Sequence, residues 1–146
     1  MPWAAFGKLG PRPKNLCFVA MPISILIADD YDDNRELLRL LLQAANYEVH
    51  EARDGHECVV LAGEKMPNLI MVDLSMPELD GWEVFRTLKA DSRTAHIPLI
   101  AVTAHTKRDC DRALGVGFSA FVSKPFKTEE MLETVARVLK ESVLQI

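Results

Sequence analysis

Short apolar runs that alternate with longer segments of helical period restrict the fold of this chain more than any other feature of the sequence. Such alternation is typical of strand–helix units joined into a parallel sheet. The run at residues 23–28 is apolar apart from one serine, as expected for a strand that is buried on both faces. We predict strands at residues 23–28, 47–52, 69–74, 97–103 and 120–123.

Each predicted strand is followed by a segment whose apolar residues recur with the period of an α-helix. The first helix, at 32–45, begins with Asp32 and Asp33, which favour the positive end of the helix dipole. The other helices are predicted at residues 55–65, 82–90, 108–114 and from 128 onward. The sequence therefore predicts an α/β fold of the (βα)5 type, with a doubly wound five-stranded parallel sheet.

The sequence also predicts the end of the fourth helix and the apolar face of the first. Gly115 and Gly117 are predicted to end the fourth helix, because glycine leaves the helical conformation easily. This helix is also the weakest, since Lys107 and Arg108 stand at its positive end. The apolar face of the first helix is predicted to consist of Leu37, Leu38, Leu41, Leu42 and Ala45.

The composition fits one compact domain with its own core: the chain has 146 residues, of which 49% are hydrophobic and 26% are charged. Its 17 basic and 21 acidic residues give a net charge of −4. The sequence contains no stripe of lysine and arginine that could follow a phosphate backbone. Nucleic acid is therefore not expected as a direct partner.

The termini and the cysteines bear on the compartment. Residues 1–21 carry several prolines and glycines without an apolar period, and we predict a loosely ordered extension before a domain at 22–146, with Met21 as an alternative start. The apolar run at 16–28 is too short to span a bilayer, and it contains the first strand, which disfavours a signal peptide. The three cysteines show neither disulfide nor zinc-ligand spacing. We expect a cytoplasmic protein without membrane insertion.

Polar residues gather where the predicted strands end. Asp29 and Asp30 follow the first strand, and Asp73 lies near the end of the third. Thr103 ends the fourth strand, and Lys124 follows the fifth. In an open parallel sheet, ligands bind at the edge formed by the carboxyl ends of the strands. We therefore expect three carboxylates, a hydroxyl and an ammonium group to converge at that edge.

Three neighbouring carboxylates repel one another, so a cation is needed to keep them all charged. Their oxygens suit Mg²⁺, whereas the absence of nearby Cys or His disfavours zinc. Asp29 and Asp30 alone could instead cap a helix and face solvent. This alternative is weaker for Asp73, because a carboxylate without a counter-ion in an apolar strand would be costly.

From about residue 23 to residue 144 the chain resembles the receiver domain of bacterial two-component response regulators. The match lies in the order and spacing of several short motifs, each weak alone. The resemblance implies a flavodoxin-like sheet with strand order 2-1-3-4-5. The motifs are Asp29-Asp30, Asp73-Leu74-Ser75-Met76-Pro77, Asp80-Gly81, Thr103-Ala104 and Lys124-Pro125-Phe126.

The resemblance implies that Asp73 is the phosphoacceptor, which takes a phosphoryl group from a phosphohistidine. Asp30, Asp73 and the backbone carbonyl of Ser75 would bind Mg²⁺ directly, and Asp29 would hold it through water. Lys124 would pair with the phosphoryl oxygens.

The resemblance also implies a switch. Thr103 would bind a phosphoryl oxygen, and Phe121 would turn inward as Thr103 moves, reshaping the surface of the fourth helix, fifth strand and fifth helix. The peptide bond before Pro125 is expected to be cis. Ser75 and His105 stand at variable positions beside the site, where a side chain can tune it.

The implied function is that of a phosphoacceptor signalling domain, not an enzyme beyond Mg²⁺-dependent self-phosphorylation and slow autodephosphorylation. Its partners would be a sensor histidine kinase or histidine phosphotransfer protein and a downstream target protein. A receiver fragment of a hybrid histidine kinase is an alternative reading. Two readings from other classes fit less well: an aspartyl-nucleophile phosphohydrolase needs a second Asp where Ser75 stands, and a flavodoxin-like mononucleotide carrier needs a Ser/Thr/Gly-rich loop where Asp29 and Asp30 stand.

Overall fold

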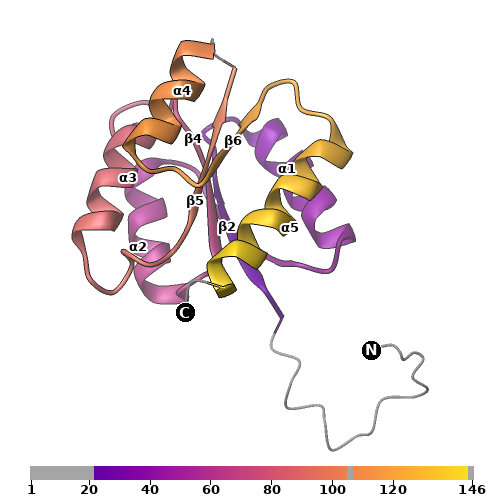
Figure 1. Cartoon of the computed structure of the whole chain (residues 1–146), viewed down its shortest axis with the longest axis horizontal. Helices are drawn as coiled ribbons and strands as arrows, with labels where there is room; N and C mark the ends of the chain where they lie inside the picture. The colour runs from indigo at the N-terminus through magenta and orange to yellow at the C-terminus, as the bar shows by residue number, and fades with distance from the viewer. Residues whose placement is uncertain (1–21, 105–106, 145–146) are drawn as a thin grey trace, which may run out of the picture.

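The computed structural model describes residues 22–104 and 107–144, and within them five parallel strands form one sheet (Figure 1). The order across the sheet is β3-β2-β4-β5-β6, which is the expected order 2-1-3-4-5 counted from the first strand of the sheet. The predicted α/β fold is therefore confirmed. The strands are β2 (Ser24–Ala28), β3 (Glu48–Ala52), β4 (Leu69–Asp73), β5 (Leu99–Thr103) and β6 (Ala120–Ser123).

Helices cover both faces of the sheet. Figure 1 shows α1 and α5 on one face and α2, α3 and α4 on the other. Among the helices of the described ranges, none is both long enough and apolar enough to cross a membrane. The helices are α1 (Asp32–Ala44), α2 (Gly55–Lys65), α3 (Gly81–Ala90), α4 (Lys107–Val116) and α5 (Thr128–Leu144).

The core has two layers, one on each side of the sheet. Alternate residues of a strand point to opposite faces, so Ile70 and Val72 of β4 join the core under α2, α3 and α4. Leu69 and Met71 of the same strand join the core under α1 and α5. Every residue of β4 and β5 is buried. This burial on both faces explains why the central strands are continuous apolar runs in the sequence.

The buried stripe of α1 differs from the predicted apolar face. Leu38 and Leu42 are buried as predicted, but Leu37 is 48% exposed, so its assignment to the core was wrong. The third member of the stripe is Arg35, which is only 9% exposed. Residues 35, 38 and 42 are spaced by three and four positions, the spacing of one helix face. A charged side chain thus occupies a position that hydrophobicity alone would not assign to the interior.

The fourth helix is longer than predicted. It runs through Gly115 to Val116, so Gly115 lies inside the helix and does not end it. Gly117 follows with a φ of 122°, a conformation that favours glycine. Its N–H donates to the Leu114 carbonyl, and the N–H of Phe118 donates to the carbonyl of Ala113. Of the two glycines, Gly117 is the one that ends the helix.

Candidate functional site

Three carboxylates meet at the carboxyl edge of the sheet. One oxygen each from Asp29, Asp30 and Asp73 lie within 4.8 Å of one another. The topology causes this meeting, because β2 and β4 are parallel neighbours in which Ala28 pairs with Val72. Asp29 directly follows the first of these partners and Asp73 the second. The structure therefore brings together the acidic residues that the sequence placed at two separate strand ends.

Two of the three carboxylates are buried and held by the main chain. Asp29 is 1% exposed and Asp73 is 6% exposed, whereas Asp30 is open to solvent. The N–H of Tyr31 donates to Asp29 Oδ1 over 2.9 Å. The N–H of Ser75 donates to Asp73 Oδ1 over the same distance. Each buried carboxylate thus accepts from the residue two positions later, which leaves its second oxygen facing the centre of the site.

Lys124 provides the positive charge at that centre. Its Nζ lies 3.0 Å from Asp73 Oδ2 and 3.2 Å from Asp29 Oδ2. The lysine follows β6, and its own N–H donates to the carbonyl of Thr103 over 2.8 Å. The peptide bond from Lys124 to Pro125 is cis, the form that the family resemblance implies. Residues from three strand ends thus form a single ion-paired group.

The charges of this group do not balance. Burial is the largest effect on Asp29 and raises its pKa, while the Tyr31 N–H and Lys124 only partly oppose it. Burial disfavours the charged form of Lys124, but Asp73 and Asp29 outweigh that effect and raise the pKa of the lysine. One ammonium group is shared between two buried carboxylates, and a third carboxylate stands beside them. This donor set, all carboxylate oxygen, fits a hard divalent cation such as Mg²⁺.

Thr103 and Phe121 lie on one face of the sheet. In the pairing of β5 with β6, Ala101 is opposite Phe121 and Thr103 is opposite Ser123. Residues two apart in a strand share a face, so Thr103, Ala101 and Phe121 all point toward α2, α3 and α4. Thr103 is fully buried, and Phe121 is half-buried against that core. The two residues expected to form a switch therefore share one side of neighbouring strands.

Gly81, the first residue of α3, allows the start of this helix to lie close to the backbone of Asp73, the phosphoacceptor candidate. A Cβ at this position would stand 2.7 Å from the backbone oxygen of Asp73 and 2.8 Å from Leu74 Cα. The preceding Asp80 accepts from the N–H of Glu83 and so caps α3. The Asp80-Gly81 motif thus combines a helix start with a backbone contact that only glycine permits.

The remaining candidates are more peripheral. Ser75 is exposed, and its N–H contacts Asp73, one of the three residues of the acidic cluster formed by Asp29, Asp30 and Asp73. His105 and the extension at 1–21 lie outside the described residues.

The sequence reasoning missed Arg35. Its Nη1 donates to the backbone carbonyl of Asp29 over 2.8 Å. The available signal was its spacing from Leu38 and Leu42, which places an arginine in the buried stripe of α1.

Comparisons with known proteins agree with this arrangement. The family model of the response regulator receiver domain matches residues 25–136. The polar-differentiation response regulator DivK of Brucella anthropi is 40% identical over 123 residues, which is 84% of this chain and 100% of that protein.

Solved structures show the same similarity. The chemotaxis response regulator CheY4 of Vibrio cholerae is 29% identical with a TM-score of 0.75, over 81% of this chain and 99% of that one. The receiver domain of a signal transduction histidine kinase from Syntrophus aciditrophicus is 34% identical with a TM-score of 0.74. That match covers 81% of this chain and 90% of the other.

Proposed function

The chain belongs to the response regulator receiver domain family, and from this membership we propose that Asp73 accepts a phosphoryl group from a phosphohistidine donor. Receiver domains act in signalling, through histidine kinases and downstream targets, rather than as catalysts for other molecules. One observation carries the proposal: the Asp73 carboxylate is buried between two further carboxylates and an ammonium group. This is the environment of a carboxylate that reacts with an anionic group only when cations are present.

In the proposed reaction, an oxygen of the Asp73 carboxylate attacks phosphorus. The bond from phosphorus to the donor nitrogen breaks, its electron pair stays on the imidazole, and an acyl phosphate forms on Asp73. Lys124, now held by Asp29 and Asp73, would pair with an oxygen of the arriving phosphoryl group. The Ser75 N–H orients the carboxylate before attack.

Receiver domains bind Mg²⁺ at an acidic pocket, and we assign that role here to the acidic cluster. Asp30, Asp73 and the Ser75 carbonyl would hold the ion directly, and Asp29 would hold it through water. When bound, Mg²⁺ neutralises charge on the phosphoryl oxygens. With this ion the domain would also accept phosphate from small phosphodonors and lose it slowly by hydrolysis.

The response would pass through Thr103 to the surface of α4, β6 and α5. Thr103 would bind a phosphoryl oxygen, and Phe121, on the same face of the sheet, would turn further inward. On that surface, α4 begins with Lys107 and Arg108, two basic residues at the positive end of the helix dipole, where they are unfavourable, and Asp109 is the acidic residue of its first turn. A weakly held helix is a suitable element for a small energetic bias to move.

The partners follow from this chemistry. A sensor histidine kinase or a histidine phosphotransfer protein would supply the phosphoryl group, and a downstream protein would bind the altered surface. The free and buried Cys58 and Cys110 support a reducing cytoplasm as the compartment. The similarity to the Syntrophus kinase receiver favours, as a second candidate, a receiver that belongs to a hybrid histidine kinase.

Intact-mass analysis after incubation with Mg²⁺ and acetyl phosphate tests the proposal. We expect one phosphoryl group per chain, sensitive to hydroxylamine as an acyl phosphate is, and none on Asp73→Asn. Asp33→Asn, a change of an exposed aspartate of α1, is the matched control and keeps the label. A label that persists in Asp73→Asn, or that resists hydroxylamine, contradicts the assignment.

A further inference from the structure

Arg35 is a charged residue in the interior of this protein, one turn into α1. It is 9% exposed and shares the buried stripe of its helix with Leu38 and Leu42. Arginine is almost never buried without partners, because desolvating a charge is costly. Its contacts therefore indicate why this position is not apolar.

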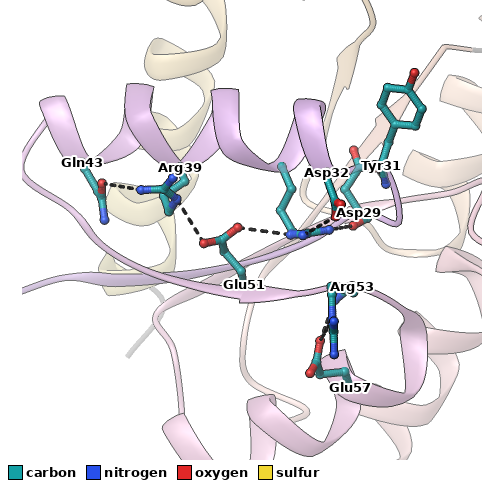
Figure 2. A network of polar contacts seen from close by, with 9 residues as sticks. Asp29, Tyr31, Asp32, Arg39, Gln43, Glu51, Arg53 and Glu57 are labelled. Carbon is teal, nitrogen blue, oxygen red and sulfur yellow. Dashed lines mark hydrogen bonds and ion pairs between the residues drawn. The ribbon is translucent and has the colours of Figure 1, made fainter.

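The guanidinium group binds three acceptors from three parts of the chain. Nη1 donates to the backbone carbonyl of Asp29 over 2.8 Å, and Nη2 donates to Asp32 Oδ1 over 2.6 Å. Nε donates to Oε1 of Glu51, on β3, over 3.1 Å. Asp29, Asp32 and Glu51, labelled in Figure 2, lie around this single planar group. The fork geometry of arginine matches three acceptors in a way that the single ammonium of lysine does not.

The contact of Arg35 with Asp29 lies where the main chain connects Asp29 to Asp30. The carbonyl of Asp29 belongs to the peptide group that joins Asp29 to Asp30. On its other side, the N–H of Asp29 donates to the carbonyl of Ala52 over 3.1 Å. The main chain is thus held before and after Asp29, and the orientation of that peptide group sets where the two carboxylates start.

The charge of Arg35 is matched within its own network. Asp32 and Glu51 accept from it, and Arg39 Nε contacts the second oxygen of Glu51 over 3.0 Å (Figure 2). Burial disfavours the charged form of Arg35, but the hydrogen bonds with Asp32 and Glu51 outweigh this effect and raise its pKa. The guanidinium of Arg35 therefore stays charged, and the charges of Arg35 and Arg39 are balanced by those of Asp32 and Glu51. The contact of Arg35 with the residues of the acidic cluster is through the backbone carbonyl of Asp29.

We propose that Arg35 is a positioning residue of the acidic site: by holding the peptide group between Asp29 and Asp30, it keeps both carboxylates in the arrangement that a divalent cation requires. This inference rests on the proposed function, because it assigns Arg35 a part in the Mg²⁺ affinity of the receiver. It does not make Arg35 a ligand. The cluster accepts a cation more tightly because its main chain does not have to be ordered on binding.

Losing the charge of Arg35 and losing its contact with Asp29 should have opposite effects on Mg²⁺ binding. Arg35→Gln removes a positive charge near the site, and by charge alone it would tighten the binding of Mg²⁺. If Arg35 positions the site, the same change weakens binding. Arg39→Gln is the matched control, because it removes the same charge from the same helix and from the same partner, Glu51, without a contact to Asp29.

Isothermal titration of the full chain with Mg²⁺ is the assay. We expect the dissociation constant to rise about tenfold in both Arg35→Gln and Arg35→Lys, the size typical for residues that orient metal ligands. In Arg39→Gln we expect it to stay within about twofold of the parent or to fall. Urea unfolding of each variant provides a second readout. If Arg35 only stabilised the fold, its variants would unfold at a lower urea concentration, but they would not bind Mg²⁺ more weakly than Arg39→Gln.

Each outcome decides between two readings. If the parent binds Mg²⁺ measurably and both Arg35→Gln and Arg35→Lys bind it equally or more tightly, the positioning role is wrong. The proposed function is then unaffected. Equal weakening in Arg39→Gln also overturns it. Arg35→Lys, which keeps the charge, decides the matter if Arg35→Gln does not fold. A parent protein that binds no Mg²⁺ and takes no phosphoryl group overturns the proposed function and this inference together.

Discussion

Replacing Lys124 by methionine tests the balance of charge at the acidic cluster. The change keeps an unbranched apolar side chain and removes only the ammonium group. That group is the shared partner of Asp29 and Asp73, at 3.2 and 3.0 Å. Without it, two buried carboxylates face each other with no cation between them. We expect the variant to be less stable than the parent when no divalent cation is present.

The burial of the three side chains sets the size of this effect. The side chains of Asp29 and Asp73 are 2% and 8% exposed, and that of Lys124 is 18% exposed. Removing one partner of a buried ion pair costs about 3–5 kcal/mol. Because solvent reaches part of Lys124 and can relax around the cluster, we expect a loss of about 2–3 kcal/mol. With a urea slope of about 2 kcal/mol per molar, the unfolding midpoint falls by about 1–1.5 M.

Urea unfolding followed by circular dichroism measures this loss in EDTA and in saturating Mg²⁺. A cation bound at the cluster replaces the missing charge, so Mg²⁺ should stabilise Lys124→Met more than the parent. Adding Asp29→Asn to Lys124→Met should restore stability in EDTA, because it removes one of the two repelling carboxylates. Double-mutant comparison separates this coupling from the effects of the single changes.

The stability that Lys124 contributes should decrease at high pH. The pKa of Lys124 is raised above its ordinary value of 10.5. Its contribution is therefore complete below pH 10.5 and is lost as the pH rises through the raised pKa. Two results would refute the reasoning: equal urea midpoints for the parent and Lys124→Met in EDTA at pH 7, or no recovery when Asp29→Asn is added.

Three further changes give distinct outcomes. Burial raises the pKa of Asp29 above 3.8, so the charged carboxylate lowers stability at neutral pH. Asp29→Asn should therefore raise the urea midpoint in EDTA at pH 7. The gain should shrink as the pH falls toward 3.8, because Asp29 of the parent then becomes protonated. Thr103→Ala should still take phosphate on Asp73 but lose most of the hydrogen-exchange change in residues 107–123 with beryllofluoride; an unaltered change would rule out the Thr103 switch. Gly81→Ala places a Cβ 2.7 Å from the Asp73 carbonyl and should cost about 1–3 kcal/mol in thermal or urea unfolding, whereas parent-like unfolding would show that the loop can shift.

The sequence by itself determined the strands and the residues that follow them. The runs at 69–74 and 97–103 are apolar throughout except where Asp73 and Thr103 stand, because central strands of a parallel sheet are buried on both faces. Once the strands are parallel, the edge where Asp29, Asp73 and Lys124 meet follows from the chain direction alone. The candidate site could therefore be located without coordinates, although the strand order came from a resemblance.

Only the tertiary structure decided which residues border the buried stripe of α1. By helical period, Arg35 and Leu37 flank the stripe of Leu38 and Leu42 on opposite sides, and hydrophobicity placed the leucine on the apolar face. In the fold Leu37 is exposed and Arg35 is buried, because Glu51 on β3 and the carbonyl of Asp29 supply acceptors for its guanidinium. Whether a charge can be buried depends on partners that are distant in sequence, and a local pattern contains no information about them. The sequence predicted that Lys124 meets the carboxylates at this edge, but only the structure showed that its ammonium group contacts both Asp29 and Asp73.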